Sequence, residues 1–165
     1  MAESIVAIVK NDGRPGAARI REMVAEAVGL LGSDWCAGAS GGRTEAACRP
    51  APQDRSAPFA RFVPPGASVV IKINVFAPYP PPVSVDRNTV AAVVGLCREA
   101  GAARMTVVEG VSVGTKLDSG ETTGRIVREL GIQAAVEREG GELVCLEDVP
   151  RVRVEVPGGA SSIRP

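Results

Sequence analysis

The chain of 165 residues contains no histidine. This absence excludes imidazole general bases, Ser-His-Asp triads, Cys-His pairs and every metal site that needs a His ligand. Much of the familiar chemistry of hydrolases is therefore not open to this sequence. Any catalysis has to rest on other side chains.

Cysteine is scarce and is not arranged as in known metal motifs. The four cysteines form no C-x-x-C pair, so the sequence contains neither a zinc knuckle nor a ferredoxin-type cluster motif. Cys97 and Cys145 lie in apolar runs, which is typical of buried core thiols. Cys36 and Cys48 lie in a polar loop, where a disulfide between them is an open alternative. We predict no metal ligands and no cofactor within the chain.

An excess of charge and a long apolar run are also missing. Nineteen basic and nineteen acidic residues give a formal net charge of zero, so there is no electrostatic footprint for nucleic acid or for an anionic membrane. No segment approaches 18 consecutive apolar residues, and the N-terminus lacks the pattern of a signal peptide. We therefore expect no nucleic-acid partner, no membrane partner and a cytoplasmic location.

What is present is an alternation of strand and helix patterns in a chain of ordinary globular composition, long enough for a single α/β domain over residues 1–165. Short β-branched runs and amphipathic stretches alternate along it. They predict strands over residues 5–9, 68–76, 105–108, 143–146 and 152–156, and helices over 17–31, 87–100 and 124–130. Asp86 is the expected N-cap of the second helix, and Gly101 its C′ residue.

Strands separated by helices need crossover connections, which favour a parallel arrangement. We therefore predict a mostly parallel sheet of four to five strands with helices packed on its faces, in three Rossmann-like layers. Ile20, Val24 and Val28 of the first helix are expected to pack on this sheet. Residues 33–65 are rich in Gly, Ala, Arg and Pro without periodicity, and we expect a flexible insertion there.

Candidate functional residues lie where the predicted strands end, because ligands of parallel α/β sheets bind outside the carboxyl ends of the strands. Lys72 stands in an otherwise apolar strand, where an unpaired ammonium is expensive to bury. We expect Lys72, Asn74 and Glu109 to converge on a small anionic ligand, with Lys72 as electrostatic stabiliser and Glu109 as acid or base. Two alternatives stay open: Lys72 merely pairs with Glu109, or this strand face is solvated.

A loop of glycines and hydroxyls follows Glu109. Ser112 and Thr115 lie in it, after a strand, which suggests a cradle for phosphate, and both are candidate ligand-binding residues. The loop matches neither the G-x-x-x-x-G-K-[ST] nor the G-x-G-x-x-G pattern.

Three blocks of the sequence resemble the family called domain of unknown function 362. They are Pro-Gly-Ala-Ser-Val-Val-Ile-Lys-Ile-Asn at 65–74, Cys-Arg-Glu-Ala-Gly-Ala at 97–102 and Val-Val-Glu-Gly at 107–110. In that family a lysine, a proline and an asparagine close the central strand, and the next strand ends in an acidic residue and glycine. Ile73 replaces the proline here, and Lys72 and Asn74 stay in register. The resemblance covers about residues 5–157, apart from the loop at 33–58.

The resemblance implies a setting as well as a fold. Members of the family are usually longer, and some carry ferredoxin-like iron–sulfur modules, so it implies a redox-linked or anaerobic metabolic system. The chain then corresponds to the N-terminal part of the family fold, a fragment or truncated homologue, and an iron–sulfur cluster belongs to a separate or missing partner module. Two function classes follow: part of an enzyme that binds a small anionic metabolite, or a non-catalytic module that binds a ligand or a protein.

Overall fold

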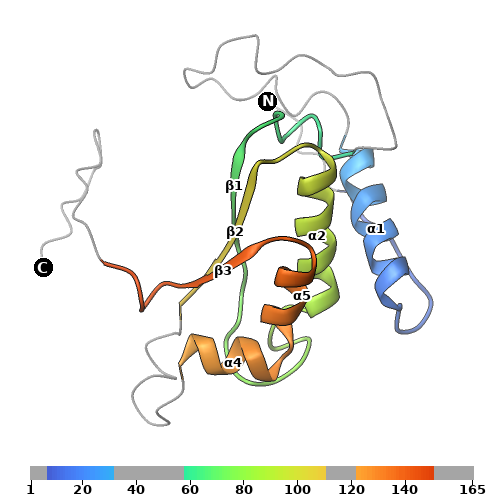
Figure 1. The fold of residues 1–165 in the computed structure, drawn as a ribbon. Coiled ribbons are helices and arrows are strands. Elements are labelled where there is room, and N and C mark those ends of the chain that lie inside the picture. Colours follow the sequence, from blue (N-terminus) through green and yellow to red (C-terminus); the bar gives the residue numbers. More distant parts are fainter. Residues whose placement is uncertain (1–6, 32–57, 111–121, 151–165) are drawn as a thin grey trace, which may run out of the picture.

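The computed structural model describes residues 7–31, 58–110 and 122–150. In this part of the chain, three parallel strands form one sheet in the order β1-β2-β3, accompanied by helices (Figure 1). The strands are β1 (Ser68–Lys72), β2 (Arg104–Glu109) and β3 (Glu142–Cys145), and the helices are α1 (Ala17–Leu30), α2 (Arg87–Glu99), α4 (Thr123–Glu129) and α5 (Ile132–Arg138). The mixed α/β class and the parallel pairing expected from the sequence are therefore confirmed.

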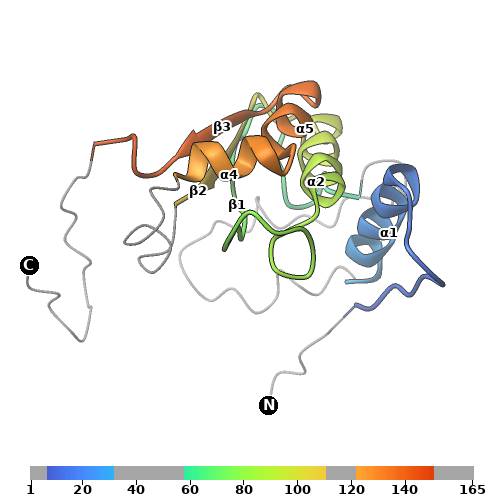
Figure 2. The ribbon, with the colours of Figure 1, turned by 90° about the horizontal axis from the view of Figure 1, so that it is seen from below.

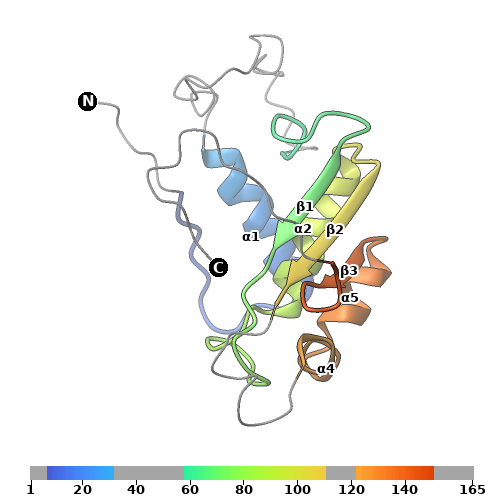
Figure 3. The same ribbon diagram turned by 90° about the vertical axis from the view of Figure 1, so that its left-hand side faces the viewer.

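The core lies between the sheet and the helices on one of its faces. α2 and α5 lie on the same side of the strands (Figures 2 and 3), and Val94, Val107 and Val136 from α2, β2 and α5 are each 0% exposed. The period-2 pattern of β1 sends Val69 and Ile71 toward this core and leaves Val70 68% exposed on the other face. Among the described residues, no helix covers that second face.

The helix ends follow local chemistry that the sequence predicts. The Asp86 carboxylate accepts a hydrogen bond from the Asn88 N–H at 2.7 Å and caps α2. Gly101 has a φ of 92° just beyond the end of α2, a conformation that favours glycine. Beyond the predicted helix at 124–130, Gly131 with a φ of 68° starts a further helix, α5, that we did not predict. Its buried side chains recur at helical spacing, at Ile132, Ala135 and Val136.

The expected four to five strands and three layers are not confirmed. Residues 7–9 of the predicted first strand are not in a strand, and residues 5 and 6 lie outside the described residues, as does the predicted strand at 152–156. Most of the predicted insertion, residues 33–57, also lies outside them. The described end of that insertion packs on the core, where Val63 is 6% exposed and Phe59 and Phe62 contact the buried cluster.

The position predicted for the first helix is wrong. α1 packs beside α2 rather than on the sheet (Figures 1 and 2), and none of the residues of α1 is fully buried. The reason is that α2 and α5 already occupy the covered face of the sheet. Polar contacts tie α1 in place: Arg21 forms an ion pair with Glu99 of α2, and the Arg61 guanidinium donates to the Val28 carbonyl. In the described segments, no helix has the length and apolar character needed to cross a membrane.

Candidate functional site

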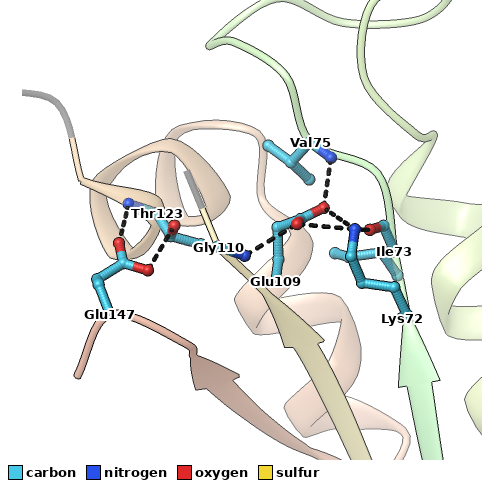
Figure 4. Close-up of polar contacts among 7 residues, drawn as sticks. All are labelled: Lys72, Ile73, Val75, Glu109, Gly110, Thr123 and Glu147. Carbon is cyan, nitrogen blue, oxygen red and sulfur yellow. Dashed lines mark hydrogen bonds and ion pairs between the residues drawn. The ribbon is translucent and has the colours of Figure 1, made fainter. Parts of the chain in front are cut away.

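Glu109, the last residue of β2, is a buried carboxylate at the carboxyl end of the sheet. The alternation along β2 places it on the same face as Met105 and Val107, and its side chain is 5% exposed. Two backbone groups satisfy it (Figure 4): the Val75 N–H donates to Oε2 at 2.7 Å, and the Gly110 N–H donates to Oε1 at 2.9 Å. A buried carboxylate needs such donors, because desolvating an unpaired charge is expensive.

Lys72, the last residue of β1, supplies the positive charge at this end. Its Nζ lies 2.8 Å from Oε1 and 3.1 Å from Oε2 of Glu109, and it also donates to the Ile73 carbonyl (Figure 4). The register pairs Lys72 with Val108, so Glu109 stands one residue beyond the paired position. The pair that the sequence left open as an alternative is therefore present. The Lys72 side chain is nevertheless 59% exposed, whereas Glu109 is not.

The chain beyond Lys72 folds back on itself and fixes the backbone near the pair. Val75 forms an isolated bridge with Ser84, and the Ser84 hydroxyl donates to the Ala77 carbonyl at 2.8 Å. Val75 and Ser84 are 4% and 3% exposed, so this loop is anchored from within. The Val75 N–H is the group that Glu109 accepts from, and Glu109 thereby joins the end of β2 to the loop after β1.

Of the other predicted site residues, Asn74 lies in the described part of the chain, and its side chain makes no hydrogen bond to Lys72 or Glu109. Asn74 is exposed, and its backbone carbonyl accepts from the Val85 N–H at 3.0 Å. Its side chain makes no hydrogen bond to any of the residues that the structure describes. Ser112 and Thr115 lie outside the described residues, so the predicted phosphate cradle stays a prediction.

A second carboxylate at the same end was not among the predicted site residues. Glu147, just beyond β3, accepts from the Thr123 N–H at 2.8 Å and from the Thr123 hydroxyl at 2.9 Å (Figure 4). Thr123 is 1% exposed, so the contact fastens the start of α4 to the end of β3. The sequence signal for it is slight, since a glutamate after a strand is usually solvated.

The chemistry open to this end of the sheet follows from these contacts. Both oxygens of Glu109 accept hydrogen bonds, from backbone N–H groups and from the Lys72 ammonium. Among the described residues, no three His, Cys, Asp or Glu side chains are grouped to hold a metal ion. The Cys145 thiol near this end of the sheet is not activated either. Its pKa is raised, mainly by burial and also by the negative charges of Glu147 and Asp148.

Comparison with known proteins bears on the family alone. No curated protein and no solved structure matches the chain. The model of the family described as Domain of unknown function (DUF362) matches residues 69–164, which is more than half of the chain and includes Lys72, Asn74 and Glu109. The match begins in β1 and so leaves out α1, which the resemblance read from the sequence had included. The chain belongs to the DUF362 family.

Proposed function

We propose that this chain binds a small anionic ligand at the carboxyl ends of β1 and β2. Lys72 supplies the charge, and the exposed Asn74 side chain supplies a hydrogen bond. One observation carries the proposal: the Lys72 ammonium is held by a buried carboxylate, yet the side chain is 59% exposed. A cation fixed in this way loses little side-chain entropy when it meets an anion, and such preorganisation favours binding.

Glu109 acts in this proposal as a positioning residue. Its oxygens accept from the N–H groups of Val75 and Gly110 as well as from Lys72. A general base needs a free lone pair within reach of the proton that it takes. The contacts therefore support binding better than catalysis by Glu109, and its role as acid or base stays a prediction.

The metabolic setting rests on the family resemblance. We propose a redox-linked or anaerobic system, in which an iron–sulfur module in a separate or missing partner supplies the electron chemistry. The described residues of this chain would contribute the anion site and no cluster ligands. A cytoplasmic location is part of the same expectation.

A second candidate function, a non-catalytic module that binds a protein, is favoured by the uncovered face of the sheet. Val70 is 68% exposed there, and the same face carries the half-buried Val108 and Val144, which are paired between β2 and β3. Contiguous apolar surface on a sheet commonly marks an interaction site. Under this alternative, Val70→Lys would abolish binding of the partner and leave anion binding unchanged.

The test of the anion site compares two lysine variants. Phosphate, pyrophosphate, acetate and citrate are titrated into the wild-type chain, Lys72→Ala and Lys10→Ala by calorimetry. Lys10→Ala is the matched control, because Lys10 is exposed and carries the same charge. A charge-assisted hydrogen bond contributes roughly 1.5–3 kcal/mol, so Lys72→Ala should weaken binding by about ten- to a hundredfold.

Three results would count against the proposal. If none of the four anions binds, small anions are excluded as the ligand class. Equal weakening in both variants shows that only net charge matters. A lower melting temperature for Lys72→Ala with unchanged affinity assigns the pair a purely structural role, which is the alternative that the sequence left open.

A further inference from the structure

A cavity of about 660 Å³ lies between α1 and the segments near the start of α2. α1 lines it with half-buried apolar side chains, and the opposite wall comes from the turn before α2. The residues that matter for the argument are Ile20, Met23, Val24 and Ala27 of α1, with Pro80 and Pro81 opposite. Neither Lys72 nor Glu109 lines this cavity, so it is separate from the anion site proposed above.

The described residues leave the apolar stripe of α1 incompletely covered. In an amphipathic helix of a soluble protein, such a stripe is normally buried in the core. Here no residue of α1 is fully buried, because α1 packs on α2 and not on the sheet. The stripe and the two prolines instead form the walls of a cavity whose size is typical of small-molecule sites, which span about 300–1,000 Å³.

The charges at the cavity point to the class of ligand. Arg14 lines it and is exposed, and within the described part of the chain Arg14 takes part in no ion pair. Asp86 is the opposing charge in the lining, but its carboxylate already accepts from the Asn88 N–H as the cap of α2. The unpaired charge at these apolar walls is therefore a guanidinium, which suits a carboxylate.

We propose that this cavity binds a small molecule with an apolar body and a carboxylate end. The body lies against the α1 stripe and the prolines, and Arg14 pairs with the carboxylate. This site does not depend on the anion site at Lys72, since it uses other residues and requires an apolar ligand.

Three ten-carbon probes test the proposal by calorimetry on the full chain: decanoate, decanol and decylammonium. They share an apolar body and differ in the charge of the head. We expect decanoate to bind most tightly and with one-to-one stoichiometry, and decylammonium least tightly. Tighter binding of decylammonium would assign the head group to Asp86 and would overturn the role of Arg14, and failure of all three probes to bind would overturn the site.

Two pairs of variants locate the site. Ala27→Trp fills the cavity and should abolish binding of decanoate, whereas Ala18→Trp, on the exposed side of α1, should not. Arg14→Gln should weaken decanoate roughly fivefold and leave decanol unchanged, as expected for a partly exposed ion pair. Arg19→Gln, the same change at an arginine that does not line the cavity, is the control.

The remaining outcomes also decide the question. Equal binding by Ala27→Trp and Ala18→Trp places the probe elsewhere and refutes the proposal. A dimer in sedimentation that Ala27→Trp dissociates, together with no binding of decanoate, would make a second copy of the chain the occupant. Because Arg14→Gln changes an exposed side chain, it keeps the test valid even if Ala27→Trp fails to fold.

Discussion

Replacing Glu109 with alanine should destabilise the domain far more than the exposure of its partner Lys72 suggests. The change removes the acceptor of the Val75 N–H, which is buried, and leaving a buried donor unsatisfied costs about 1–3 kcal/mol. The Gly110 N–H is half-buried and adds a smaller loss, because water can replace the carboxylate there. Lys72 is 59% exposed and regains hydration, so its part is about 1 kcal/mol or less.

The expected total is ~2–4 kcal/mol, which for a domain of this size lowers the melting temperature by about 5–15 °C. Thermal unfolding followed by circular dichroism measures it. Glu142→Ala is the matched control. Glu142 of β3 also forms an ion pair with a residue of the neighbouring strand, Arg104 of β2, but both of these side chains are more than half exposed. We expect no measurable shift there. If the two variants lose the same amount, or if Lys72→Ala loses as much as Glu109→Ala, then the backbone donors are not what makes Glu109 important.

Two further predictions concern glycines and a thiol. Gly29→Ala should stabilise the chain by about 0.5 kcal/mol, because Gly29 lies in α1 with free space around it. Gly131→Ala should destabilise it by about 1 kcal/mol, because Gly131 has a φ of 68° and an added Cβ would lie 3.0 Å from the Arg87 guanidinium. A change of the same sign for both variants in thermal unfolding would contradict this prediction. Burial raises the pKa of Cys97, so the folded state holds the thiol proton more tightly than the unfolded state, and this contribution to stability is complete below the ordinary thiol pKa of about 8.5 and is lost as the pH rises through the folded pKa. Urea unfolding at pH 8 and pH 10 should therefore show a smaller alkaline loss in Cys97→Ala, and an unchanged loss would refute the argument.

Local patterns predicted the elements of this fold well. The strand and helix periodicities found β1, α2 and β2, and Asp86 and Gly101 marked the ends of α2, because capping depends on residues next to each other in the sequence. Local patterns cannot predict which of several amphipathic helices packs on the face of the sheet. The stripe of α1 suits a sheet face, but α2 and α5 pack there, and only the assembled layers decide which helix is displaced.

The candidate site was also predicted only in part from the sequence. Strand ends pointed to Lys72 and Glu109, since parallel strands bring their carboxyl ends to one edge. The hydrogen bond from the Val75 N–H to Glu109 was not predictable, because it depends on how the chain after β1 turns back. Asn74 falls outside the strand because β1 ends at Lys72, whereas the predicted strand ran to residue 76.

The contacts of Glu109 join segments that lie far apart in the sequence. Lys72 and Val75 are 37 and 34 residues from Glu109 along the chain, and all of α2 lies between. The Gly110 N–H is close to the carboxylate along the chain, but the contacts with Lys72 and Val75 require that the intervening loop, with α2 in it, be closed and that β1 and β2 be paired. The contact between Lys72 and Glu109 therefore depends on the pairing of β1 and β2 and is lost when the two strands separate. A cross-link or a fluorescent label placed across it would report whether the sheet is intact, independently of what the site binds.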